Sequence, residues 1–235
     1  MKFAICIALA LAAQAAWAAA PFEDSMAQRT LACVACHGKE GRAGPDGYYP
    51  RIAGKPAGYL YNQLLNFRDG RRHYGLMARL LDPLSDAYLL EIAQHFASLD
   101  VAYAAPPRST APASVLQRGE LLVRQGERSR NIPACVQCHG ETLTGVMPNT
   151  PGLLGVSRDY LNAQLGAWRT GQRRAHEPDC MAAIARRLAP DDVAAVAAWL
   201  AAQPVPDRAR AVAALPRPHE ISCGSAIAPA GRQQP

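Results

Sequence analysis

The sequence lacks a long hydrophobic run after its first twenty residues, so no later segment is predicted to cross a membrane. It also lacks segments in which apolar and polar residues alternate, and we therefore expect little sheet. Lys and Arg exceed Asp and Glu by 25 to 19, but no basic stripe concentrates them. Nucleic-acid binding is therefore not predicted. These absences leave a helical protein, and we predict the all-α class.

The first 20 residues have the pattern of a secretory signal peptide. Lys2 gives a positive start, residues 3–13 form an apolar run, and small residues at 18–20 precede Pro21. The run is too short to span a bilayer, which favours a cleaved signal over an uncleaved membrane anchor. We therefore predict an exported, periplasmic protein. Cys6 leaves with the signal, and the other six cysteines are expected to be bridged, ligated or covalently used.

An internal repeat relates the two halves of the chain. The paired segments are 33–38 with 135–140, 50–70 with 151–171, and 77–99 with 181–203. Within the middle pair, eight positions are identical, and the three pairs follow one another in the same order. We infer that an ancestral domain of about ninety residues was duplicated, since that size commonly folds as one unit.

The matching segments carry helical patterns. Leu60 and Leu64 recur on one helical face, and Ser157 is the predicted N-cap of the corresponding helix in the second copy. Ser85 and Pro190 are predicted to begin the last helix of each copy. The predicted division is a signal peptide at 1–20, domain one at 21–104, a proline-rich linker at 105–113, domain two at 114–204 and a Pro/Ala/Arg-rich, irregular or mobile tail at 205–235.

Both copies contain C-x-x-C-H, the spacing at which a c-type haem is attached. The predicted thioether-forming residues are Cys33, Cys36, Cys135 and Cys138, and the predicted iron ligands beside them are His37 and His139. A thioredoxin-like dithiol would need a βαβ setting, and a zinc site would leave the adjacent histidines unexplained. With only 4 Phe and 3 Trp, each small domain would have a weak core, so a buried porphyrin would supply the missing apolar volume.

Each iron needs a sixth ligand from elsewhere in its domain. Met77 and Met181 occupy the same place in the repeat, before the last helix, and a thioether binds ferrous iron well. The other candidates are His73 and His95 in the first domain, and His176 and Cys180 in the second. The repeat favours the two methionines over these candidates and over a role as core filler. Met147 is expected to be a packing residue.

Cys180 and Cys223 are the two cysteines outside the motifs. Cys180 has no counterpart in the first copy, where Leu76 stands. A disulfide between the two cysteines would fasten the tail to the second domain, and an oxidising compartment favours it. The sequence leaves the alternative open that a Cys180 thiolate binds the iron instead.

The repeated segments resemble the cytochrome c4 family, exported dihaem proteins made of two tandem class I cytochrome c domains. The resemblance runs from about Ser25 to Gln203 and rests on CVACHG, CVQCHG, PRIAGKPAGYLYNQLLNFRDGRR, MARLLDPLSD and YLNAQLGAWRTGQRR. It implies two covalently bound haem c groups with His/Met ligation, which maps onto His37 with Met77 and His139 with Met181. It also implies a periplasmic electron carrier, often loosely membrane-associated.

The resemblance implies redox protein partners for this carrier. The expected donor is a protein such as a quinol-oxidising complex, and the expected acceptor is a terminal oxidase or another reductase. Two alternatives from other classes stay open: a thiosulfate dehydrogenase-like dihaem enzyme and a cytochrome subunit of a larger oxidoreductase complex. Cys180 keeps the enzyme alternative open, because thiosulfate-oxidising dihaem proteins use a Cys-ligated haem. We predict a carrier with no catalytic residues of its own.

Overall fold

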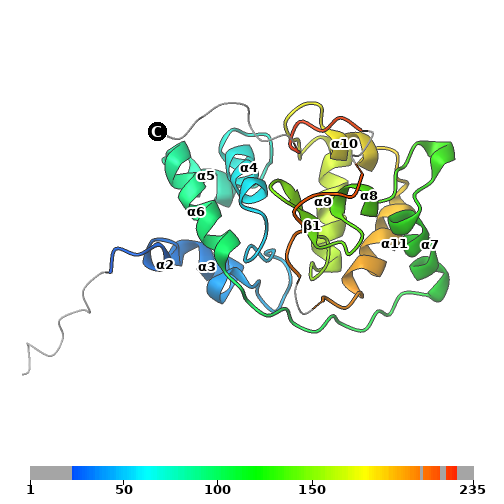
Figure 1. Ribbon diagram of the computed structural model, residues 1–235, viewed down its shortest axis with the longest axis horizontal. Coiled ribbons are helices and arrows are strands. Elements are labelled where there is room, and N and C mark those ends of the chain that lie inside the picture. Colours follow the sequence, from blue (N-terminus) through cyan, green and yellow to red (C-terminus); the bar gives the residue numbers. More distant parts are fainter. Residues whose placement is uncertain (1–22, 207–208, 218–220, 227–235) are drawn as a thin grey trace, which may run out of the picture.

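The protein is described by a computed structural model that covers residues 23–206, 209–217 and 221–226. The predicted signal peptide lies outside the described residues. Figure 1 shows two helical halves side by side, the earlier part of the chain in blue to green and the later part in green to orange. An irregular connector at 99–112 runs along one side of the molecule from the first half to the second.

The first half consists of helices around a small apolar cluster. Its elements are α2 (Met26–Arg29), α3 (Leu31–His37), a 3₁₀ helix (Lys39–Gly41), α4 (Ala57–Arg68), α5 (Gly75–Leu81) and α6 (Asp86–Ser98). Ser85 caps α6 as predicted, because its hydroxyl accepts a hydrogen bond from the Tyr88 N–H at 3.2 Å. α4 and α6 bury Leu60, Leu89 and Ile92 between them.

The second half repeats this plan and adds a short hairpin. Its elements are α7 (Ala113–Arg124), a 3₁₀ helix (Arg128–Arg130), α8 (Val136–His139), β1 (Gly145–Val146), β2 (Thr150–Pro151), α9 (Arg158–Thr170), α10 (Cys180–Ala185) and α11 (Pro190–Ala201). Ser157 caps α9, as predicted, by accepting from the Tyr160 N–H at 3.2 Å, and Gly171 ends the helix with a φ of 77°. Apart from this hairpin and isolated bridges, the regular secondary structure of the described residues is helical, so the all-α prediction is confirmed.

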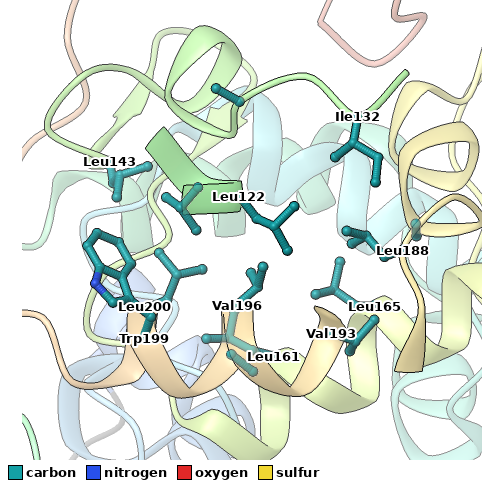
Figure 2. Close-up of a cluster of buried hydrophobic side chains, with 14 of the residues drawn as sticks. Leu122, Ile132, Leu143, Leu161, Leu165, Leu188, Val193, Val196, Trp199 and Leu200 are labelled. Atoms are coloured by element: carbon teal, nitrogen blue, oxygen red, sulfur yellow. The ribbon is translucent and has the colours of Figure 1, made fainter. Parts of the chain in front are cut away.

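The larger apolar cluster fills the second half (Figure 2). Leu122 on α7, Leu165 on α9 and Val196 on α11 are buried in it. α7 and α11 approach closely at Gly119, where an added Cβ atom would collide with the Ala195 carbonyl oxygen. The first half has fewer buried apolar side chains, so its core depends more strongly on a buried non-protein group.

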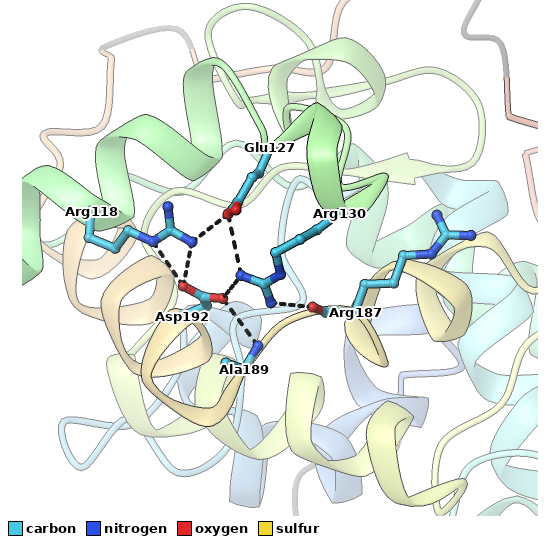
Figure 3. A network of polar contacts seen from close by, with 6 residues as sticks. All are labelled: Arg118, Glu127, Arg130, Arg187, Ala189 and Asp192. Carbon is cyan, nitrogen blue, oxygen red and sulfur yellow. Dashed lines mark hydrogen bonds and ion pairs between the residues drawn. The ribbon is translucent and has the colours of Figure 1, made fainter.

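A polar network fastens α7 and the 3₁₀ turn before α8 to the start of α11 (Figure 3). Asp192 accepts hydrogen bonds from Arg118 at 2.9 Å and from Arg130 at 2.7 Å, and Glu127 accepts from Arg118 at 2.6 Å. The Asp192 carboxylate also accepts from the Ala189 N–H at 3.1 Å, which caps α11. The network thereby fixes the elements that flank the second C-x-x-C-H motif.

The described residues of the tail after α11 are irregular, as predicted, but they are bound to the second half. Val212 exchanges backbone hydrogen bonds with Gly145 at 3.0 Å and with Met147 at 2.8 Å. A disulfide joins Cys180 to Cys223, so the hypothesis of a bridge is confirmed. Within the described ranges, no helix combines the length and apolar character that crossing a membrane requires.

Candidate functional site

The first C-x-x-C-H motif lies on α3, which ends at its histidine. Cys33 and Cys36 are free thiols one helical turn apart, Cys33 half-buried and Cys36 exposed. Gly38 follows with a φ of 74°, and an added Cβ atom there would collide with the Ala43 carbonyl oxygen. The glycine therefore lets the chain turn sharply after His37, which directs the histidine inward.

The second motif has the same local structure on α8. Cys135 precedes the helix, Cys138 lies on it, and both are free and half-buried. The helix ends at His139, and Gly140 follows with a φ of 83°. The repeat in the sequence is thus a repeat in backbone geometry.

The two motif histidines are oriented by equivalent hydrogen bonds. His37 Nδ1 lies 2.8 Å from the Pro50 carbonyl oxygen, and His139 Nδ1 lies 2.8 Å from that of Pro151. A carbonyl oxygen can only accept, so Nδ1 carries the proton and Nε2 keeps its lone pair for a metal. Burial lowers the pKa of both imidazoles, which keeps them neutral. Both rings are therefore prepared as neutral Nε2 ligands.

The thiols of the motifs do not have the character of a reactive dithiol. Burial raises the pKa of Cys135 to about 12 and also raises the pKa of Cys33 and Cys138. Redox-active C-x-x-C pairs instead have a lowered pKa on the attacking thiol. The described residues contain no group of three or more His, Cys, Asp and Glu side chains arranged to hold a metal ion. The motif environments thus differ from those of a thioredoxin-like pair.

A mostly apolar cavity of about 940 Å³ lies between the two halves. This volume is near the upper end of the range of about 300–1,000 Å³ for small-molecule and cofactor pockets. The predicted site residues that line it are Cys33, Cys36, His37 and Met77 from the first half and Cys135, Cys138, His139 and Met181 from the second. The structure therefore brings all of them to one cavity.

The two methionines reach the cavity from short helices that the sequence analysis did not predict. Met77 lies on α5, which packs on α4, and Met181 lies on α10, which packs on α9. Both side chains are half-buried. Their equivalent positions support the pairing of each methionine with the histidine of its own half.

The other candidate ligands are less well placed. His95 and His176 do not line the cavity, and His73 lines it but is exposed. The Cys180 sulfur is bonded to Cys223, so it is not available as a thiolate. The expectation that Met147 is a packing residue is wrong, because its side chain is 47% exposed.

Two buried arginines meet where the halves join. Arg72 donates to Gln63 Oε1 at 3.0 Å, to Gln164 Oε1 at 2.7 Å and to the Tyr160 hydroxyl. Arg173 donates to Gln164 Oε1 at 2.8 Å and to Gln63 Oε1 at 3.0 Å. Each amide oxygen therefore accepts from one arginine of its own half and one of the other. The two halves are linked by a pseudo-symmetric set of hydrogen bonds.

The buried cations test whether the cavity fits a haem. Arg72, Arg173 and Lys55 line the cavity, are at most 8% exposed, and make no ion pair with a carboxylate of the described chain. A buried cation without a counter-ion is strongly destabilising, so this site calls for an anionic group. Haem propionates are anions attached to a flat apolar ring. The cavity fits a haem because it combines thiols, neutral imidazoles, thioethers, apolar walls and cations without a carboxylate partner.

Sequence reasoning proposed the candidate ligands but did not point to these cations. Arg72 and Arg173 occupy equivalent positions of the repeat, as Gln63 and Gln164 do, so the duplication held a signal that was not used. Lys55 has no such signal, because Val156 stands at the equivalent position.

Comparisons with known proteins agree with this geometry. No family model matches the chain. A cytochrome c4 from Pseudomonas aeruginosa is 32% identical, with 68% of this chain and 78% of that protein covered. The chain belongs to the cytochrome c4 family. Like other members it is a dihaem electron carrier with two covalently bound haem c groups.

Other relatives and solved structures refine this picture. A thiosulfate dehydrogenase electron acceptor from Thiomonas intermedia is 39% identical, covering 77% of this cytochrome and 80% of that protein. The structure of reduced recombinant cytochrome c4 from Pseudomonas stutzeri has a TM-score of 0.64 at 28% identity, covering 77% and 98%. That of a thiosulfate dehydrogenase (TsdBA) from Marichromatium purpuratum has a TM-score of 0.66 at 33% identity over 73% of this chain. This cytochrome spans only 36% of that longer chain.

Proposed function

We propose that this cytochrome is the periplasmic acceptor of electrons from a thiosulfate-oxidising dehydrogenase. The observation that carries the proposal is the 39% identity, over 181 residues, to a protein named as the electron acceptor of thiosulfate dehydrogenase. The similar TsdBA chain supports it, since a unit of this fold there forms part of a protein named thiosulfate dehydrogenase. The cytochrome would then pass the electrons to a terminal oxidase or another reductase.

In this proposal each half is a domain that holds one haem c. Cys33 and Cys36 would hold the first haem by thioethers, and His37 and Met77 would bind its iron. In the second half, Cys135 and Cys138 would have the covalent role, and His139 and Met181 would bind the iron. The equivalent hydrogen bonds of both histidines and the shared cavity support this arrangement.

The surrounding side chains have defined roles in this carrier. The bound haem iron supplies one-electron chemistry by cycling between its ferric and ferrous states. The carbonyl oxygens of Pro50 and Pro151 hold the imidazoles in one orientation through oxidation and reduction. Arg72 and Arg173 compensate negative charge at the junction of the halves, and the apolar walls exclude water. Because a histidine and a methionine would hold each iron, no substrate-binding role is proposed for it.

The first half offers a place for a redox partner to approach. Tyr48 and Leu76 line the cavity and yet are 60% and 62% exposed, and Cys36 beside them is also exposed. An apolar rim of this kind around a cofactor edge suits a transient contact with the dehydrogenase. The site of electron entry is therefore proposed to be the first half.

A catalytic role is less well supported. The enzyme alternative depends on a free Cys180 thiolate as an iron ligand, and that sulfur is bonded to Cys223. Two relatives in the sequence comparison are named as electron acceptors of thiosulfate dehydrogenase, and this chain spans only 36% of the longer TsdBA chain. We therefore place this protein downstream of the oxidation step.

The proposal is tested by anaerobic stopped-flow absorbance with the oxidised, full-length holoprotein. A catalytic amount of a purified dihaem thiosulfate dehydrogenase is expected to reduce both haems after thiosulfate is added. The reduction rate should saturate as the cytochrome concentration is raised. Omitting the enzyme or the thiosulfate should leave the spectrum unchanged. Reduction by a quinol-oxidising complex but not by the dehydrogenase would overturn the proposed donor. Thiosulfate oxidation by the cytochrome alone, with ferricyanide as acceptor, would overturn the carrier role.

A further inference from the structure

Lys55 belongs to the first half, and its side chain contacts the second half. It lies in the turn before α4, its side chain is 8% exposed, and it lines the cavity. Its Nζ donates a hydrogen bond to the carbonyl oxygen of Gly152 at 3.3 Å. A lysine from the first half is therefore anchored on the backbone of the second.

The anchoring point belongs to the loop that orients His139. Gly152 directly follows Pro151, whose carbonyl oxygen accepts the hydrogen bond from His139 Nδ1. The Lys55 ammonium group therefore lies beside the segment whose carbonyl oxygen orients the His139 ring. Lys55 is thus a cationic neighbour of the proposed second haem, supplied by the other half of the chain.

The ammonium group is buried without a carboxylate partner. None of the ion pairs of the described residues includes Lys55. Burial lowers its pKa to about 8, so the group is still mainly protonated at neutral pH. A haem propionate nearby would favour the charged form further.

The arrangement is not reciprocal. Val156 occupies the position equivalent to Lys55 in the repeat. The second half therefore has no cationic side chain at this position that could approach the His37 site. Arg72 and Arg173, in contrast, occupy equivalent positions and bind both halves alike. Lys55 is therefore a charge that distinguishes the two cofactor sites of an otherwise duplicated molecule.

We propose that Lys55 raises the reduction potential of the second haem relative to the first, which directs electrons from the first half to the second. Reduction removes one positive charge from the iron site, so a fixed cation nearby stabilises the ferrous state more than the ferric state. The effect is strong because the group is buried and poorly screened by solvent. This inference rests on the proposed attachment of the second haem at His139.

The test is a spectroelectrochemical titration of the full-length holoprotein, with haem-methyl NMR signals followed in partly reduced samples to assign each step to a haem. Lys55→Gln is expected to weaken electron binding at the second haem about tenfold, which corresponds to about 59 mV for a one-electron couple. The first haem should shift much less. Lys55→Arg keeps the charge and should retain the parent potential, and Lys39→Gln, at an exposed lysine, should leave both unchanged.

Three outcomes would overturn the inference. Equal shifts at both haems, no shift at either, or the same shift in Lys55→Gln and Lys55→Arg would show that the charge does not distinguish the sites. If Lys55→Gln does not retain both haems, Val156→Lys provides the independent test, since a cation at the equivalent position should raise the potential of the first haem. Absence of that rise would overturn the inference. The electrode sets the potential in this titration, so the experiment stands even if the proposed dehydrogenase proves not to be the donor.

Discussion

Arg72 and Arg173 face each other across the junction of the two halves as partners in an antiparallel β-bridge. Each guanidinium lies over an aromatic ring of its own half, Arg72 at 4.4 Å from the Phe67 centroid and Arg173 at 3.8 Å from the Trp168 centroid. All four residues are equivalent pairs in the repeat. The junction therefore has the two-fold pseudo-symmetry expected if the ancestral domain once formed an isologous dimer.

Replacing Arg72 tests how much this junction stabilises the molecule. Arg72→Met removes charged hydrogen bonds to both amide oxygens and should lower the free energy of unfolding by about 2 kcal/mol. Arg72→Lys should lose a similar amount, since an ammonium group cannot reproduce the planar fork of donors. Guanidinium unfolding of the holoprotein, followed by haem absorbance, measures the change. Arg42→Met, at an exposed arginine, is the control and should change stability by less than about 1 kcal/mol.

The proposed methionine ligands can be tested separately in each half. Met77→Ala and Met181→Ala should each remove about half of the far-red methionine-to-iron absorption band of the oxidised protein, and each should lower the potential of one haem. Met147→Ala, at an exposed methionine, should keep the full band. If Met181→Ala retained the full band, the proposed ligand of the second haem would be wrong.

The features that the sequence predicted depend on local spacing and on duplication. The C-x-x-C-H motifs are contiguous, so their chemistry can be recognised without a fold. The caps at Ser85 and Ser157 are also local, because each hydroxyl bonds to a backbone N–H three residues later. Met77 and Met181 were proposed as ligands from their equivalent positions in the repeat. None of these inferences requires knowledge of how the two halves pack together.

The features that were missed depend on how the halves meet. The hydrogen bond from Lys55 to Gly152 joins residues 97 positions apart, and no periodicity indicates such a contact. α5 and α10 have seven and six residues, too few to show a reliable helical period. The exposure of Met147 follows from its place in the hairpin region, where its backbone pairs with Val212 of the tail. Such contacts can be predicted only when the tertiary packing is known.

The Asp192 network predicts how the second half responds to acid. Burial alone would raise the pKa of Asp192, but hydrogen bonds from Arg130 and Arg118 outweigh it, so the pKa is lowered. A lowered pKa contributes stability that is present above the unfolded value of about 3.9 and is lost as the pH falls through the folded value. Asp192→Asn should therefore lower the free energy of unfolding by about 2 kcal/mol at pH 7 and leave it almost unchanged in strong acid.

Urea unfolding at a series of pH values measures this difference between parent and variant. The matched control is Glu40→Gln, which removes an exposed ion pair to Arg42 in the first half. That substitution should lower the free energy of unfolding by less than about 1 kcal/mol at any pH. A cost for Asp192→Asn that stayed constant below pH 3 would show that the carboxylate charge is not what the network uses.

The Cys180–Cys223 bond predicts a stability effect without a change in iron ligation. The bond closes a sequence separation of 43 residues, for which the chain-entropy relation gives about 4 kcal/mol. Beyond it, the Gly224 N–H donates to Pro178 at 3.0 Å, and the Ser225 carbonyl accepts from Asn62 of the first half at 3.4 Å. The double variant Cys180→Ser/Cys223→Ser should therefore unfold more readily in denaturant, with more accessible haem.

Two measurements on that variant separate the roles open to Cys180. Its oxidised visible spectrum should keep the full methionine-to-iron band, because Met181 still reaches the cavity. Parent protein treated with a thiol reductant and alkylated should show the same loss of stability, whereas non-reduced parent should take up no alkylating label. A new axial-ligand spectrum in the serine variant would instead make Cys180 a haem ligand. A sulfur already bonded to Cys223 cannot bind iron as a thiolate. A new spectrum in the serine variant should therefore be accompanied by alkylation of the non-reduced parent, and an unchanged spectrum by no alkylation.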